Sequence, residues 1–185
     1  YNFFFFAFIL SSCVSNKSAL KSFNSAEYSI AAEKFQKVVK DNDPKTNFLI
    51  AEAFRKSNQI WEAERYYSQS INEGFDNELA YYYLIISLKA NNKYDAADSV
   101  AKKYLKIGSD ETVINLINKE SLYIENLKKY PDTSYYKVKN LNAINTTFAD
   151  YAPSYSKGKL YFVSNRSTEK LYKGTGTPFT DLFEV

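Results

Sequence analysis

The stretches YSIAAEKFQKVV (residues 28–39), IWEAERYYSQSI (residues 60–71) and YDAADSVAKKYL (residues 94–105) decide the fold of this chain. Their first residues are 32 and 34 positions apart, and similar side chains follow at the same offsets. The matched positions are Tyr28, Ile60 and Tyr94; Ala31, Ala63 and Ala97; Phe35, Tyr67 and Ala101; and Val39, Ile71 and Leu105. Offsets of three, seven and eleven residues lie on one face of a helix, so the pattern predicts three equivalent amphipathic helices.

A partner helix is predicted before each copy. Tyr81, Leu84, Ile85 and Leu88 fall at helical spacing, and polar turns at 57–59 and 91–93 separate the two helices of a unit. The segments 41–44, 73–76 and 107–110 each carry a helix stop or cap between units. A small Ala at one fixed place lets the partner helix approach, and an aromatic side chain one turn later fills the remaining gap in two of the three copies.

This pattern resembles the tetratricopeptide repeat, a hairpin of two helices. We therefore predict a mainly α-helical fold, with a tetratricopeptide-type α-solenoid over residues 18–129. Its first helix is weak, with only Ala19, Leu20 and Phe23 as apolar residues, and residues 109–129 form a capping helix. A generic helical bundle with accidental periodicity is the alternative.

An apolar run near the start of the chain indicates a secretion signal. Residues 3–10 read FFFFAFIL, which is shorter than the roughly 20 residues needed to span a bilayer. The following LSSC (residues 10–13) resembles the bacterial lipobox, in which the Cys sulfur receives diacylglycerol. We assign residues 1–12 to a signal peptide, residues 13–17 to a lipidated tether and Cys13 to the lipidation site. A buried structural thiol is the alternative for Cys13.

The periodicity changes after Pro131. Alternation predicts a short extended stretch over 136–141, and LYFV (residues 160–163) reads as a strand after the turn at 156–159. Together, residues 140–142, 150–155, 159–166 and 178–183 (PFTDLF) resemble the opening blade of the WD-like propeller in Bacteroidota outer-membrane lipoproteins of the OmpA family, PorE type.

That resemblance has several implications. Residues 130–185 would be the start of a truncated β-propeller, and the chain would be an N-terminal fragment of a longer protein. In that family a β-sandwich and an OmpA-like domain follow, so peptidoglycan would be bound only through domains missing here. Asp150, Arg166 and Asp181 would stabilise the blade rather than catalyse a reaction.

Composition argues against most catalytic sites. The 185 residues contain no His and a single Cys, so His-based triads, the usual zinc sites and an internal disulfide are excluded. The net charge of +3 is spread along the sequence without a basic run, so nucleic acid is not an expected partner. The pairs Glu62/Glu64 and Asp95/Asp98 read as solvated helix charge, and GTGT (residues 174–177) reads as a flexible loop. We expect no catalytic residue, cofactor or metal ion.

These observations predict a non-enzymatic lipoprotein scaffold. The membrane would hold it through Cys13, and protein partners would bind the helical repeats. The family resemblance implies the outer membrane, the periplasmic side, and a role in type IX secretion and gliding. A SusD-like glycan-binding lipoprotein is the alternative, supported by the consecutive aromatics Tyr81–Tyr83.

Overall fold

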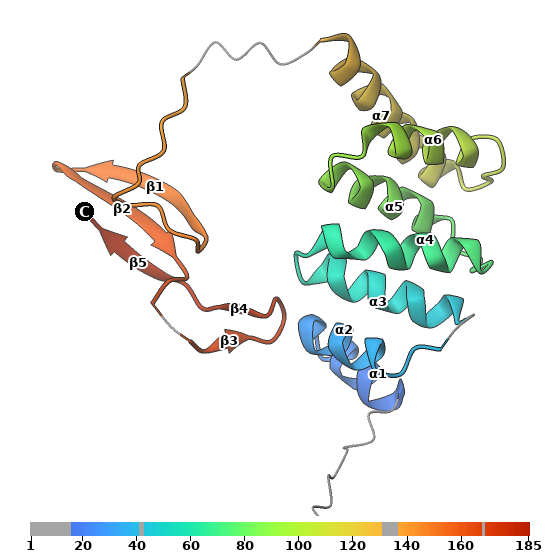
Figure 1. Ribbon diagram of the computed structural model, residues 1–185, viewed down its shortest axis with the longest axis horizontal. Helices are drawn as coiled ribbons and strands as arrows, with labels where there is room; N and C mark the ends of the chain where they lie inside the picture. The colour runs from blue at the N-terminus through green and yellow to red at the C-terminus, as the bar shows by residue number, and fades with distance from the viewer. Residues whose placement is uncertain (1–15, 41–42, 131–136, 168) are drawn as a thin grey trace, which may run out of the picture.

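The computed structural model describes residues 16–40, 43–130, 137–167 and 169–185. Most of this chain is helical, and a small antiparallel sheet follows towards the C-terminal end (Figure 1). The helices are α1 (Asn16–Asn24), α2 (Tyr28–Gln36), α3 (Pro44–Lys56), the 3-10 helix η1 (Ile60–Ala63), α4 (Glu64–Asn72), α5 (Leu79–Ala90), α6 (Tyr94–Tyr104) and α7 (Glu111–Lys129). They pair as α1/α2, α3/α4 and α5/α6 and stack into an array that α7 ends, as the repeat predicts. None of the described helices is long and apolar enough to cross a membrane.

The core of the array consists of the two central positions of the repeated pattern. Ala31, Ala63 and Ala97 are fully buried, and so are Phe35, Tyr67 and Ala101. The first helices contribute Ile50, Ala51, Leu84, Ile85 and Leu88 to the same cluster. The small Ala side chains allow close helix packing, and the burial of this apolar surface drives the stacking of the hairpins.

Each hairpin closes with the same turn. Ala26, Asn58 and Asn92 occupy the equivalent position and have positive φ angles of 57°, 61° and 58°. The residue after each one donates its backbone N–H to a carbonyl five residues earlier: Glu27 to Ser22, Gln59 to Phe54 and Lys93 to Leu88. This is the bonding of a left-handed helix C-cap, which satisfies carbonyls that the helix end leaves open.

On the opposite edge of the array, polar bonds join the two helices of a unit. Asn47 Nδ2 donates to Glu73 Oε2 at 2.9 Å, and Ser70 Oγ donates to the carbonyl of Pro44 at 2.8 Å. The carboxylate of Glu78 accepts from the Tyr104 hydroxyl, from Ser109 and from the backbone N–H of Asp110. These donors lower the pKa of Glu78 to about 2.

Two helix boundaries differ from the sequence prediction. Helix α1 already includes Asn16 and Lys17, which we had assigned to the tether. The second helix of the middle unit begins as the 3-10 turn η1 before continuing as α4. The capping helix is confirmed as α7, which starts where Asp110 accepts the backbone N–H groups of Thr112 and Val113.

The C-terminal part is a small β unit. The strands β1 (Asp150–Ser156), β2 (Lys159–Ser164) and β5 (Asp181–Glu184) form an antiparallel sheet in the order β1-β2-β5. A separate hairpin consists of β3 (Leu171–Tyr172) and β4 (Thr177–Pro178). The predicted strand at 160–163 is confirmed, with Phe162 buried and stacked on Phe183. The extended stretch predicted over 136–141 is wrong for its described residues, since 137–141 pair with no strand and Val138 is 93% exposed.

The turn of the β3–β4 hairpin contacts the helical array. In Figure 1 the β unit lies beside the edge of the array that carries the turns within the hairpins, and the β3–β4 hairpin points at α2. Lys173 Nζ donates to Glu27 Oε1 at 2.9 Å, and Gln59 Nε2 donates to the carbonyl of Thr175 at 3.0 Å. The Ser29 N–H donates to the carbonyl of Gly174. We refer to residues 173–176 as the docking turn.

Candidate protein-binding face

The first helices of successive hairpins share a face of aromatic rings and paired charges. On α3, Arg55 forms two hydrogen bonds to Glu52, at 2.9 and 2.6 Å. The guanidinium also lies over the ring of Tyr83 on α5, 4.1 Å from its centre. The hydroxyl of Tyr67 donates to Glu52 from α4. The Glu52 carboxylate therefore holds the Arg55 guanidinium in place on the face. Through Tyr67 and Tyr83, this cluster connects α3, α4 and α5.

The same arrangement recurs between α5 and α7. Lys89 on α5 pairs with Glu120 on α7, and its Nζ lies 4.0 Å from the centre of the Tyr123 ring. Tyr82 lies between the two charge pairs, with its ring 5.2 Å from that of Tyr83. We call this surface the inter-repeat face and define it by Arg55, Tyr82, Tyr83, Lys89 and Tyr123.

Burial and charge set the protonation states on this face. Burial and the Glu52 carboxylate raise the pKa of Tyr67, and the Glu52 hydrogen bonds raise the pKa of Arg55. Burial, with the nearby Glu120 charge, raises the pKa of Tyr82. The tyrosines therefore stay neutral hydroxyl donors, and Arg55 stays charged, across the physiological range.

These groups suit binding better than bond-breaking chemistry. Each cation of the inter-repeat face already has a carboxylate partner, and Tyr123 leaves 49% of its surface exposed. Rigid aromatic rings beside fixed donors are typical of surfaces that hold another chain. Among the described residues, no three Cys, Asp or Glu side chains form a group that could hold a metal ion.

The structure places the residues that the sequence singled out in different surroundings. Cys13 lies outside the described residues, so its lipidation stays a prediction. Tyr81 packs on Tyr104 at a ring distance of 5.1 Å and belongs to internal packing. Tyr82 and Tyr83 lie on the inter-repeat face. Arg55, Lys89 and Tyr123 were missed, because their pairing joins separate units and leaves no mark in the spacing of any one helix.

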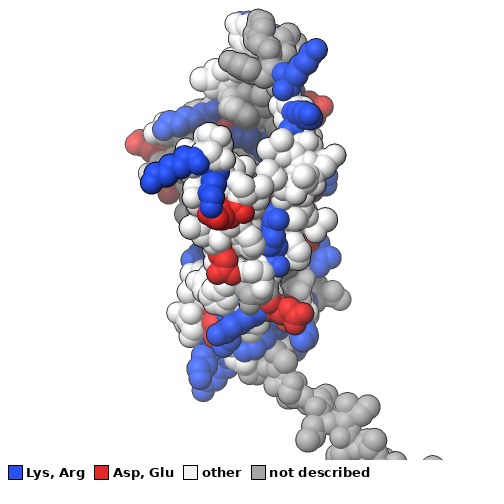
Figure 2. All heavy atoms as spheres, turned by 90° about the vertical axis from the view of Figure 1, so that its left-hand side faces the viewer, with Lys and Arg blue, Asp and Glu red and all other residues white. Residues whose placement is uncertain are grey.

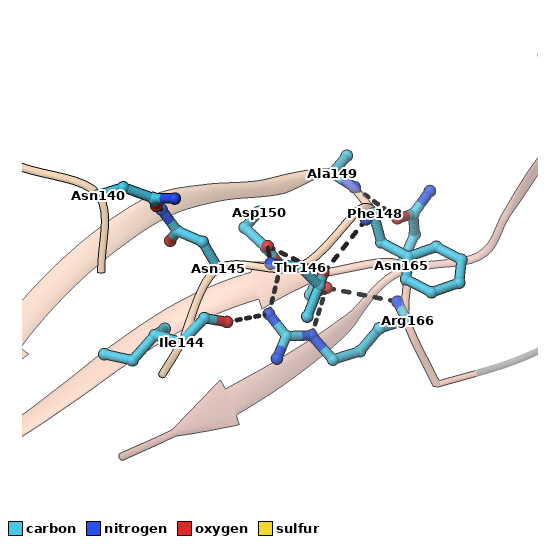
Figure 3. Close-up of polar contacts among 10 residues, drawn as sticks. Asn140, Ile144, Asn145, Thr146, Phe148, Ala149, Asp150, Asn165 and Arg166 are labelled. Carbon is cyan, nitrogen blue, oxygen red and sulfur yellow. Dashed lines mark hydrogen bonds and ion pairs between the residues drawn. The ribbon is translucent and has the colours of Figure 1, made fainter. Parts of the chain in front are cut away.

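Asp150 and Arg166 meet in one network of the β unit (Figure 3). The Arg166 guanidinium donates to Asp150 Oδ1 at 2.5 Å, to the carbonyl of Ile144 at 2.8 Å and to Ser164 Oγ at 2.9 Å. The second oxygen of Asp150 accepts from the backbone N–H of Thr146 at 2.8 Å. Together, Arg166 and these hydrogen bonds hold the pKa of Asp150 well below its usual range.

This network ties the segment before β1 to the sheet. The Arg166 guanidinium also lies 5.0 Å from the ring centre of Phe162 and 5.2 Å from that of Phe183. Nε and Nη2 of Arg166 therefore both have protein partners. Asp181 lies apart from this network and accepts from the Ser167 hydroxyl. The arrangement explains Asp150 and Arg166 as structural residues of the β unit.

The carboxylate pairs and the glycine-rich stretch also have structural partners. Glu64 accepts from Lys93 at 2.8 Å, and Asp95 accepts from Lys128 at 2.6 Å, so these charges join neighbouring helices. Residues 174–176 belong to the docking turn of the β3–β4 hairpin and Thr177 begins β4, and the contact of this turn with the array was not expected from the sequence. On the face in Figure 2, which carries the β unit, basic and acidic side chains alternate with broad uncharged areas.

Comparisons with known proteins give a likeness of fold. No family model matches the chain, and no curated protein matches it. It is similar to the Yersinia enterocolitica type III secretion chaperone SycD, solved in complex with a peptide of the translocator YopD. The identity is 17%, the TM-score is 0.51, and the match covers 62% of this chain and 92% of that one. A second SycD structure matches with 17% identity and a TM-score of 0.44, over 60% of this chain and 84% of that one. The helical part therefore has a tetratricopeptide-type fold.

Proposed function

We propose that this protein is a non-enzymatic scaffold that binds an extended segment of a partner protein on the inter-repeat face. The observation that carries the proposal is the continuity of this face over α3, α5 and α7, where Arg55 lies over the ring of Tyr83 and Lys89 lies over the ring of Tyr123. The similar SycD structure was solved with a translocator peptide, which supports a peptide as the kind of partner.

The finer proposal is a membrane-anchored member of a larger assembly. The lipobox at residues 10–13 supports a lipid anchor on Cys13. The resemblance to PorE-type lipoproteins of the OmpA family supports the outer membrane, its periplasmic side, and partners in type IX secretion and gliding. The β unit would then be the start of a β-propeller, and contact with peptidoglycan would belong to other domains.

Site-specific photocrosslinking in cells tests the binding face. A photoreactive residue replaces Tyr82 or Tyr123 of the inter-repeat face, and Glu62 or Lys103, both exposed on second helices, serve as controls. We expect one and the same partner to be captured from both face positions and from neither control. Equal capture from all four positions, or none from the face, would overturn the proposed binding face.

Membrane fractionation tests the anchor separately. The Cys13→Ser variant removes the only thiol of the chain and leaves the described fold untouched. We expect this variant to leave the membrane fraction, since it loses the acyl chains that would hold the protein at the membrane. Unchanged retention of Cys13→Ser in the membrane would contradict lipidation at this residue.

A glycan-binding function has one observation in its favour. Tyr82, Tyr83 and Tyr123 place three rings along the inter-repeat face, and exposed aromatic faces also bind sugars. Glycan binding that disappears in Tyr82→Ala and Tyr123→Ala, without loss of the photocrosslinked partner, would favour a SusD-like sugar-binding role.

A further inference from the structure

The first hairpin and the segment after it carry a net positive charge. Residues 16–40 contain five lysines and two glutamates, a net charge of +3. Residues 79–108 and residues 137–185 each carry the same net charge, so the first hairpin differs from them in its position directly after Cys13 and not in its net charge.

Folding leaves most of these lysines exposed, and among the described residues none of the exposed ones forms an ion pair. Lys17, Lys21, Lys37 and Lys40 are exposed. Lys34 donates from α2 to Ser22 of α1 at 2.8 Å, so the charges of the two helices lie on one hairpin.

The nearby acidic groups already have other partners. Glu27 forms an ion pair with Lys173 of the docking turn. Lys173, together with the Ser22 hydroxyl and the nearby charge of Lys34, lowers the pKa of the Glu27 carboxyl. Asp43 accepts from the backbone N–H of Thr46 and caps α3. Asp41 lies outside the described residues. Of the two glutamates in the hairpin, only the exposed Glu33 is left to oppose the lysines.

The outward face of α1 combines charge with apolar surface. Lys17, Leu20, Lys21 and Asn24 line a shallow hollow on this end helix, and Leu20 is 39% exposed. An exposed Leu between two lysines is typical of helices that lie against lipid headgroups, where the apolar group enters the interface and the ammonium groups meet phosphate.

The proposed anchor places this hairpin next to the bilayer. Cys13 precedes Asn16, the first residue of α1, by three residues. Three residues span at most about 11 Å in any conformation. The Debye length at physiological salt is about 8 Å, so a tether this short lets lysines at the start of α1 come within the range of the surface charge.

We propose that the α1/α2 hairpin is a headgroup-binding surface for anionic phospholipid, which stands the array on the membrane with its first repeat against the bilayer. The orientation rests on the proposed function, because it takes Cys13 as the anchor. Each Lys near an anionic membrane strengthens binding by about fivefold.

Vesicle co-sedimentation of the unlipidated Cys13→Ser chain tests this surface without the anchor. The probes are vesicles of phosphatidylcholine alone and vesicles of phosphatidylcholine with phosphatidylglycerol. The variants are Lys17→Glu/Lys21→Glu and Lys37→Glu/Lys40→Glu. The matched control is Lys103→Glu/Lys106→Glu, which makes the same charge change at exposed positions of the third hairpin. The apolar residues 3–10 are common to all variants, so they cancel in the ratio of bound fractions.

We expect each hairpin variant to lose about 25-fold or more of its binding to the anionic vesicles, from about fivefold per lysine. The control should change by less than about twofold, because its lysines lie beyond the screening length of the first hairpin. Binding to phosphatidylcholine should be equal for all. Equal losses in hairpin variants and control, or no loss, would overturn the proposal. Release by inorganic phosphate beyond that by chloride at equal ionic strength would indicate a discrete phosphate site instead and would also overturn it.

The proposed lipid anchor and the proposed headgroup-binding surface can be disproved independently of each other. If wild type and Cys13→Ser fractionate alike in cells while the hairpin variants still lose vesicle binding, lipidation at Cys13 is wrong and the headgroup surface stands. If Cys13→Ser leaves the membrane but the vesicle series shows no difference, the anchor stands and the surface is wrong.

Discussion

At the scale of single residues, Glu52 has the most partners on the inter-repeat face. Its carboxylate is 8% exposed and accepts from Arg55 and from the hydroxyl of Tyr67. Removing its charge leaves Arg55 on α3 without a counterion and takes an acceptor from a fully buried tyrosine. A buried group that loses its partner costs more than the hydrogen bond itself contributes.

Glu52→Ala should lower the free energy of unfolding by about 3 kcal/mol, the range found when one partner of a buried ion pair is removed. Urea denaturation followed by circular dichroism measures this loss. Glu62→Ala, at an exposed position one helix away, should change stability by less than about 0.5 kcal/mol. Similar losses in both variants would show that the Glu52 cluster does not stabilise the array.

Glu78 should give the array a dependence on acid. Its pKa falls from 4.5 to about 2 in the folded protein, chiefly through the Ser109 and Tyr104 hydroxyls. Because the folded pKa is the lower one, this contribution is complete above 4.5 and is lost as the pH falls towards about 2.

The stability difference between wild type and Glu78→Gln should therefore shrink across that acid window. Urea midpoints at several pH values measure it. Glu62→Gln is the control, and its difference from wild type should stay flat with pH. A wild-type advantage over Glu78→Gln that persists unchanged below the folded pKa would contradict the role assigned to this carboxylate.

At the scale of secondary-structure elements, the turn within each hairpin is the feature most nearly determined by local sequence. Asn58 and Asn92 occupy left-handed positions, which Asn tolerates well, whereas the first hairpin has Ala26 there, with a φ of 57°. A Cβ atom in this conformation costs roughly 1–2 kcal/mol for residues other than Gly, Asn and Asp. The first hairpin therefore has strain that the other two avoid.

Ala26→Gly should raise the free energy of unfolding by about 1 kcal/mol, because Gly removes the left-handed strain. Thermal unfolding measures the change. Ala96→Gly, at an exposed site within α6, should instead lower stability by about 0.5–1 kcal/mol. A drop in stability for Ala26→Gly would show that the turn does not carry this strain.

At the scale of the whole molecule, the described part of the β unit contacts the array through the docking turn. It consists of the Lys173–Glu27 pair, two hydrogen bonds to the carbonyls of Gly174 and Thr175, and close packing of Gly176. A Cβ atom on Gly176 would lie 2.4 Å from Ser29 Oγ. Exposed ion pairs are weak and screened by salt, so a contact of this size opens readily.

Lys173→Glu should open the contact, Glu27→Lys should do the same, and the double variant should restore it. A pair of spin labels, one at Lys157 of the β unit and one at Glu62 of the array, reports the opening as a broader distance distribution. Lys159→Glu, which changes charge in the β unit away from the turn, should leave the distribution as in wild type. Failure of the double variant to recover the narrow distribution would show that the pair does not hold the two parts together.

Local sequence determined the helical hairpins. Ala31, Ala63 and Ala97 recur with the repeat, the turn and cap residues stand between them, and each signal acts within a few residues of the chain. The strand at 160–163 was predictable for the same reason. The stretch 137–141 was mispredicted because alternation forms a strand only where a neighbour pairs with it, and this segment has none.

Only the tertiary structure decided the features that join distant residues. Arg55 meets Tyr83, Lys89 meets Glu120, and Gln59 meets Thr175 across 116 residues, and no local periodicity encodes such pairs. Spacing reports the face a residue takes on its own helix, and packing decides what that face meets.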